Sequence, residues 1–85
     1  MKFLHWEVDA GPDNVIQVEL SRQANVLLLD ESNFSAYRGG RRYRYSGGHA
    51  KRTPAVLVPP RDGHWHVVVD LGGYGGHVEA SVAVC

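Results

Sequence analysis

Alternation of apolar and polar positions dominates this chain and predicts short β-strands. Over residues 3–9, one set of alternate positions is Leu4, Trp6 and Val8, and the other set is Phe3, His5, Glu7 and Asp9. The run VIQVEL, residues 15–20, again points its apolar side chains to one side. A period of two is typical of a strand with one buried face. We therefore predict two strands, separated by the turn sequence GPDN.

The run NVLLLD, residues 25–30, is continuously apolar and too short for a stable helix, which predicts a strand covered on both faces. One or two helical turns are expected over residues 31–38, with Asp30 and Ser32 as capping candidates and Gly39 and Gly40 as the stop. The next segment, RRYRYSGGHAKR, fits either a short strand or an extended loop. PAVLV, residues 54–58, reads as a strand whose flanking prolines suit a sheet edge.

Two further strands are predicted near the C-terminus. Residues 64–71 place Trp65, Val67, Val69 and Leu71 on one face, and residues 77–84 do the same with Val78, Ala80, Val82 and Val84. The glycine-rich stretch between them suggests that the two strands form an antiparallel hairpin. With about seven short strands, the predicted fold class is all-β: a small antiparallel β-sandwich or partly closed barrel, with one short helical turn near residues 31–38.

Length and composition fit one domain spanning residues 1–85. The chain is 44% hydrophobic and 21% charged, which is ordinary for a globular protein with a thin core. Its one cysteine, Cys85, allows no internal disulfide and favours a reducing, cytoplasmic location. The N-terminal stretch reaches Glu7 and Asp9 before any long apolar run. We therefore expect neither a signal peptide nor a membrane span.

The net charge is zero, but the charges are unevenly distributed. Between Ser32 and Arg61 the chain has seven basic residues and no acidic one. Arginines can pair bidentately with phosphate or carboxylate, and tyrosine rings can stack on bases or sugars. The predicted ligand-binding residues are Arg38, Arg41, Arg42, Tyr43, Arg44, Tyr45, His49, Lys51 and Arg52. We call this set the basic-aromatic surface, and its expected partner is an anionic ligand or a protein.

A structural interpretation of the same residues stands beside the functional one. The arginines could pair with carboxylates from elsewhere in the fold, and Tyr43 and Tyr45 could belong to the core. Nucleic acid is chemically compatible with the segment, but the zero net charge counts against it, because nucleic-acid-binding domains are usually basic overall.

His64 and His66 are two apart on a predicted strand, so both rings leave the same face and form a weak candidate for a metal site. In the predicted hairpin, His77 lies four residues along the strand from His66, about 13 Å away, too far to share one ion. A looser arrangement recruits His5 and Glu7, provided that the first strand lies beside the sixth. The favoured interpretation is that the two histidines are partly exposed, or bonded to a loop, while Trp65 anchors the core.

No catalytic residues are predicted. The serines are scattered, and Ser46 lies near His49 in sequence without an identifiable third group. The motif G-x-S-x-G is absent, and LGGYGG lacks the lysine and the hydroxyl residue of a phosphate loop. We therefore expect no cofactor.

Four motifs, RQANV, D-x-SNF-x-x-Y, GGHAKR and GHWHVVVDLGGY, recur in a known family. In these the chain resembles the bacterial domain of unknown function 1883. The resemblance implies a compact, mostly-β domain, found alone or attached to TIR-type signalling domains, and it carries over no catalytic residue. The leading hypothesis is a non-enzymatic binding or sensing module. The alternatives are a small metal-dependent or hydrolytic protein built on His64 and His66, and a structural unit that oligomerises through an exposed sheet edge.

Overall fold

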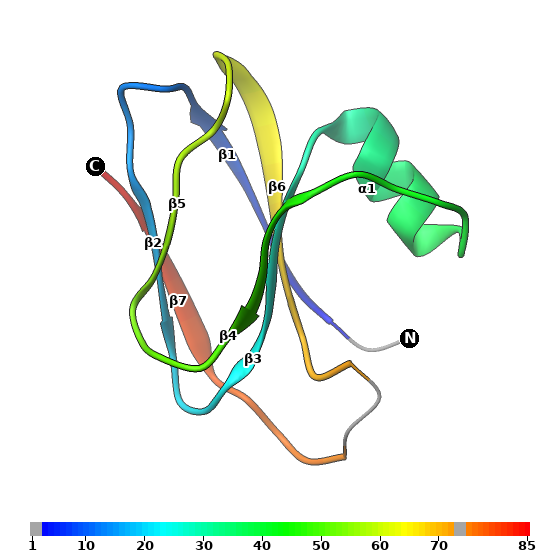
Figure 1. The fold of residues 1–85 in the computed structure, drawn as a ribbon, viewed down its shortest axis with the longest axis vertical. Helices are drawn as coiled ribbons and strands as arrows, with labels where there is room; N and C mark the ends of the chain where they lie inside the picture. The colour runs from blue at the N-terminus through cyan, green and yellow to red at the C-terminus, as the bar shows by residue number, and fades with distance from the viewer. Residues whose placement is uncertain (1–2, 73–74) are drawn as a thin grey trace.

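The computed structural model describes residues 3–72 and 75–85, which form seven strands and one helix. In chain order these are β1 (Leu4–Ala10), β2 (Ile16–Leu20), β3 (Ala24–Leu29), α1 (Glu31–Arg38), β4 (Ser46–Ala50), β5 (Ala55–Leu57), β6 (Gly63–Asp70) and β7 (Ala80–Val84). The strands form two antiparallel sheets, of order β1-β6-β3-β4 and β5-β2-β7 (Figure 1). The predicted all-β class is confirmed, and the described strands form a sandwich rather than a closed barrel.

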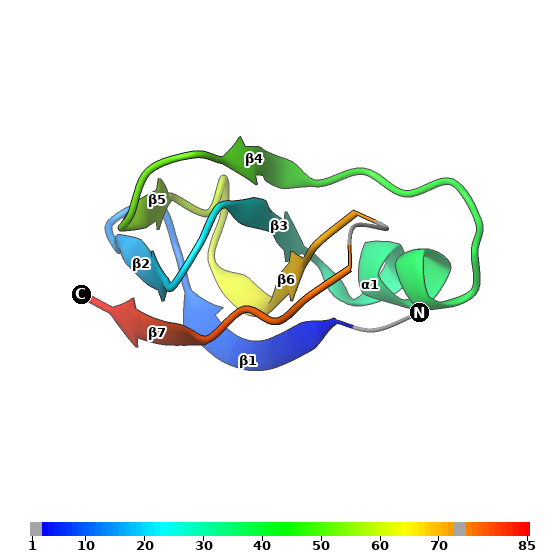
Figure 2. The same ribbon diagram turned by 90° about the horizontal axis from the view of Figure 1, so that it is seen from below.

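The molecule has three layers, seen edge-on in Figure 2: the three-stranded sheet, the four-stranded sheet and the helix α1. The larger hydrophobic cluster fills the space between the two sheets and includes Ile16, Val18, Leu28, Trp65 and Val67. A second, smaller cluster joins the four-stranded sheet to α1. Its buried members are Leu27, Leu29, Phe34, Tyr37 and Val68. Trp65 is 4% exposed, so its predicted role in the core is confirmed.

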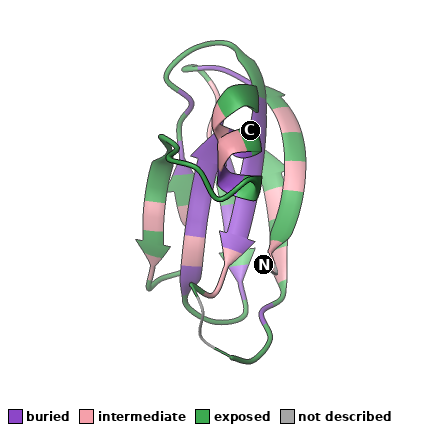
Figure 3. Ribbon diagram, turned by 90° about the vertical axis from the view of Figure 1, so that its right-hand side faces the viewer, coloured by how far each residue is buried: buried purple, intermediate pink, exposed green. Residues whose placement is uncertain are grey.

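Strand β3 is covered on both faces, as its continuous apolar run predicts. Val26 and Leu28 belong to the cluster between the sheets, whereas Leu27 and Leu29 belong to the cluster beneath α1. The strand lies between β6 and β4 in the sheet, and it is among the most deeply buried segments in Figure 3. Both faces need apolar side chains because a sheet covers one and a helix covers the other.

Helix α1 begins and ends where the sequence predicts. The Asp30 side chain caps the first turn by accepting a hydrogen bond from the Asn33 backbone N–H at 2.9 Å. At the other end, the Gly39 backbone N–H donates to the carbonyl of Ser35. Phe34 and Tyr37, three apart, are the buried residues of the helix. No helix within residues 3–72 and 75–85 is long and apolar enough to cross a membrane.

The predicted hairpin of residues 64–71 and 77–84 is wrong. Strand β6 pairs with β1 and β3, whereas β7 pairs with β2 in the other sheet. Alternation fixes which face of each strand is buried, and the apolar faces of β6 and β7 do meet in the core between the sheets. Alternation does not fix which strand lies beside another. Two strands in different sheets, joined by a connection that crosses from one sheet to the other, therefore satisfy the same pattern. The last strand also begins later than predicted, at Ala80.

Residues 41–45 are irregular, and the strand of this region begins only at Ser46. The extended-loop alternative therefore holds for RRYRY, and the strand alternative holds for SGGHA. Tyr43 and Tyr45 are 36% and 51% exposed, so they are not core residues. Gly73 and Tyr74, within the predicted hairpin turn, lie outside the described residues.

Candidate functional site

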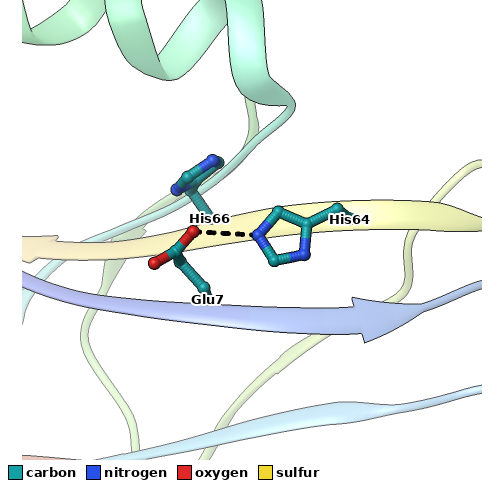
Figure 4. Close-up of side chains that lie close together, drawn as sticks. All are labelled: Glu7, His64 and His66. Carbon is teal, nitrogen blue, oxygen red and sulfur yellow. Dashed lines mark hydrogen bonds and ion pairs between the residues drawn. The ribbon is translucent and has the colours of Figure 1, made fainter.

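Polar side chains from β1 and β6 gather on the face of the sheet that carries α1. The antiparallel register sets Glu7 opposite His66 and Asp9 opposite His64. Because side chains alternate across a strand, all four project to the same side. Figure 4 shows Glu7, His64 and His66 close together below the helix. The first strand thus lies beside the sixth, which is the condition on which the looser metal arrangement depended.

His64 is held by two carboxylates. Its Nδ1 lies 2.8 Å from Asp9 Oδ1, and its Nε2 lies 2.9 Å from Glu7 Oε1. The hydrogen bonds to Glu7 and then to Asp9 raise the pKa of His64 above its ordinary value. The same bond lowers the pKa of Glu7. Both Glu7 and His64 remain exposed to solvent.

His66 is 2% exposed, in contrast to the partly exposed residue that the sequence suggested. The Phe34 ring covers it, with ring centroids 4.2 Å apart and planes 5° from parallel. Its Nδ1 lies 2.7 Å from His5 Nε2, so its partner is a neighbouring strand and not a loop. Burial is the main cause that lowers the pKa of His5, and the electrostatic effect of the nearby His66 lowers it further.

The Nε2 atom of His66 is buried and has no hydrogen-bond partner in the described parts of the chain. The Oε2 atom of Glu31 lies 2.9 Å away, but its direction does not meet hydrogen-bond geometry. Glu31 is also largely exposed, so water competes for its carboxylate. A buried ring nitrogen without a hydrogen-bond partner costs free energy and is rare in folded proteins, so its presence here needs an explanation.

Glu7, His64 and His66 each have one donor atom within 4.8 Å of those of the other two, a spacing compatible with a metal ion. His77 is not part of this cluster of described residues, although the hairpin register used to separate it was wrong. Its Nε2 lies 3.8 Å from Glu79 on an exposed surface. We call Glu7, His64 and His66 the two-histidine cluster.

The basic-aromatic surface lies along the chain from the end of α1 to the residues after β4, and all nine predicted side chains are exposed. Contacts with the helix hold this segment in place. The Arg44 backbone N–H donates to Asn33 Oδ1 at 2.7 Å, and the Tyr43 ring meets the Tyr37 ring edge-on at 5.2 Å. The Arg38 guanidinium lies 5.7 Å from the centroid of the Phe34 ring.

Three of the predicted residues, Tyr43, Tyr45 and His49, line an open groove of about 1300 Å³. Asp70 lies in the same groove, where its carboxylate accepts hydrogen bonds from the Tyr37 hydroxyl at 2.6 Å and from Asn25 at 3.0 Å. Burial and the bond to Asp70 raise the pKa of Tyr37 well above its usual range. None of the arginines of this set lines the groove. The structure therefore brings the aromatic residues of the predicted site into the groove, whereas the basic residues are only their neighbours in sequence.

The family model of the domain of unknown function DUF1883 matches residues 1–85, the whole chain. The chain belongs to the DUF1883 family. No curated protein and no solved structure matches it. Both the two-histidine cluster and the basic-aromatic surface therefore lie within the DUF1883 domain itself.

For this DUF1883 chain, the sequence predicted Glu7 and His5 near the two histidines only if the first strand lay beside the sixth. It did not identify Asp9 or Glu31. One signal was available. Residues 67–69 are three consecutive valines, so both faces of this strand are apolar and its second face must also be covered. His66 shares that second face with Val68, which points to a buried histidine. The identity of the neighbouring strand carries no such signal.

Proposed function

We propose that this domain is a non-enzymatic binding module whose basic-aromatic surface contacts an anionic ligand. The observation that carries the proposal is that the basic side chains of this surface are exposed and unpaired among the described residues. Six basic side chains of the surface are exposed, and none is within ion-pair distance of a carboxylate of the described residues. They are Arg38, Arg41, Arg42, Arg44, Lys51 and Arg52. By contrast, Arg61 at the end of the basic block pairs with Asp30 at 3.0 Å.

Aromatic side chains next to these cations supply a second kind of contact. Tyr43 and Tyr45 are neighbours, with ring centroids 5.6 Å apart, and both line the groove. Exposed tyrosine faces beside guanidinium groups suit ligands that combine negative charge with flat rings or sugars. Asp70 in the groove opposes an anion there, so we place the charged part of the ligand on the arginines and its ring on the tyrosines.

The test measures binding to heparin and to a labelled single-stranded oligonucleotide as a function of salt. We compare the wild type with the double variant Arg41→Ala/Arg42→Ala, and we use Arg22→Ala/Arg61→Ala as a control with the same loss of charge. For an oligonucleotide, two lost phosphate contacts should flatten the slope of log K against log salt by about 1.4. The control variant should keep the wild-type slope.

Two outcomes contradict the proposal: no salt-dependent binding to either polyanion, or equal loss in the two double variants. Binding to heparin alone identifies a sulfated or acidic sugar as the ligand class. Binding to the oligonucleotide that weakens in Tyr43→Ala assigns base stacking to that ring, with an expected cost of about 1–3 kcal/mol.

A further inference from the structure

We propose that the two-histidine cluster, Glu7, His64 and His66, binds a divalent transition-metal ion, with zinc as the best match. This inference does not depend on the anion-binding proposal, because it uses different residues. Two imidazoles and one carboxylate are the donor set of many three-ligand zinc sites. Imidazole nitrogen also selects transition metals over magnesium and calcium, which prefer oxygen ligands.

The spacing of the three donor atoms requires only small movements. They lie within 4.8 Å of one another, whereas ligands on one tetrahedral zinc ion are about 3.3 Å apart. Glu7 Oε1 and His64 Nε2 are already 2.9 Å apart and belong to exposed side chains that can rotate. His66 is fixed by its burial, so the two mobile ligands would close on the rigid one.

The nitrogen partners of both histidines favour the site. A metal-binding histidine usually bonds its other ring nitrogen to a neighbouring group, which fixes the ring and its tautomer. Here, His64 Nδ1 lies 2.8 Å from Asp9 and His66 Nδ1 lies 2.7 Å from His5. Both Nδ1 atoms are therefore occupied, so each ring would present Nε2 to an ion. At His64 this nitrogen is bonded to Glu7 Oε1, which is itself a proposed ligand.

The unsatisfied Nε2 atom of His66 is a separate reason to expect an ion at this cluster. It is buried beneath Phe34 and makes no hydrogen bond in the described structure. An ion that coordinates it removes the cost of that unsatisfied atom. At His64, the ion takes the place of the proton shared with Glu7, and that proton passes to solvent. The Glu31 carboxylate, whose Oε2 lies 2.9 Å from His66 Nε2, offers a fourth ligand from the helix side.

An exposed pair elsewhere in the chain provides a matched control. His77 and Glu79 lie 3.8 Å apart, with side chains 82% and 81% exposed, so they share the chemistry of His64 and Glu7. They lack a buried third ligand among the described residues. If an ordinary surface His–Glu pair were enough to attract zinc, the two pairs would behave alike.

The experiment titrates the untagged, chelator-treated and dialysed 85-residue chain with zinc chloride by calorimetry, and with cobalt(II) by visible absorption. We expect one ion per chain, and no binding of magnesium. Glu7→Gln and His64→Ala should each weaken zinc binding at least tenfold, and Asp9→Asn by about 10- to 100-fold as a positioning residue. His77→Ala and Glu79→Gln should bind like the wild type. Circular dichroism confirms that each variant is folded.

Three results would overturn the proposal. One is the absence of saturable zinc binding. Another is zinc binding that survives both Glu7→Gln and His64→Ala, and the third is an equal loss in His77→Ala. Tetrahedral cobalt(II) bands that disappear in His64→Ala but persist in His77→Ala would instead place the ion at the two-histidine cluster. His66→Leu gives a further check, because it removes the buried ligand without adding a charge.

Discussion

Replacement of His66 by leucine tests whether this buried histidine is retained for stability. Its Nε2 is buried and makes no hydrogen bond to any of the described residues. A buried polar group left unsatisfied costs about 1–3 kcal/mol, whereas the bond from Nδ1 to His5 is worth about 0.5–1.5 kcal/mol net. His5 itself is exposed, so water can replace His66 as its partner. We therefore expect His66→Leu to be at least as stable as the wild type.

The free energy of unfolding should rise by about 1 kcal/mol, which is the difference between the midpoints of these two ranges, about 2 and about 1 kcal/mol. In a domain of this size, each kcal/mol shifts Tm by about 4–8 °C. The measurement is urea denaturation, with a thermal scan, in the presence of a chelator. A folded variant that is less stable than the wild type by more than about 1 kcal/mol would show that His66 is satisfied in the native state.

If His66→Leu loses stability, Glu31→Gln tests whether Glu31 is the partner that satisfies His66 Nε2. Removing a charge from the first helical turn costs about 0.3–1 kcal/mol whether or not Glu31 contacts His66. In a double-mutant cycle with His66→Leu, independent residues should be additive within about 0.5 kcal/mol. A larger coupling would mean that Glu31 pairs with Nε2 after all. The buried nitrogen would then need no ion.

Two further predictions concern the frame around these surfaces. Gly47 has φ +103°, and a Cβ there would overlap the Val26 carbonyl oxygen, so Gly47→Ala should lose about 1–3 kcal/mol in urea denaturation. Gly48→Ala, with φ +143° and open space, should lose less; equal losses would contradict the steric argument. Asp30→Ala should cost about 1 kcal/mol at neutral pH through loss of the helix cap. The Asn33 N–H lowers the pKa of Asp30, so the gap to wild type should close in acid, as pH falls through that native pKa; a constant gap would refute this.

Local features of this fold could be predicted because each depends on residues close in sequence. The cap at Asp30 and the stop at Gly39 depend on the first and last turns of one helix. The buried strand β3 follows from its unbroken apolar run, which only two covered faces can accommodate. The basic-aromatic surface is likewise continuous in sequence. Its exposure could be tested directly, whereas its ligand is still a prediction.

The two-histidine cluster could not be predicted in the same way, because it depends on strand order. Glu7 and His66 are far apart in sequence and meet only because β1 pairs with β6. Many strand orders satisfy the same alternation, including the hairpin that the sequence favoured and the structure contradicts. The chemistry of each residue was readable, but their proximity was not.

Helix α1 links the two surfaces physically. Its two buried residues face different candidate sites: Phe34 stacks on His66, while Tyr37 contacts Tyr43 and donates to Asp70. They lie one helical turn apart, so a shift of the helix moves both contacts together. An ion that draws Glu7 and His64 toward His66 acts beneath Phe34, and a ligand in the groove acts on Tyr43 beside Tyr37. Any energetic coupling between the two sites must be reciprocal, and this helix is one packed route between them.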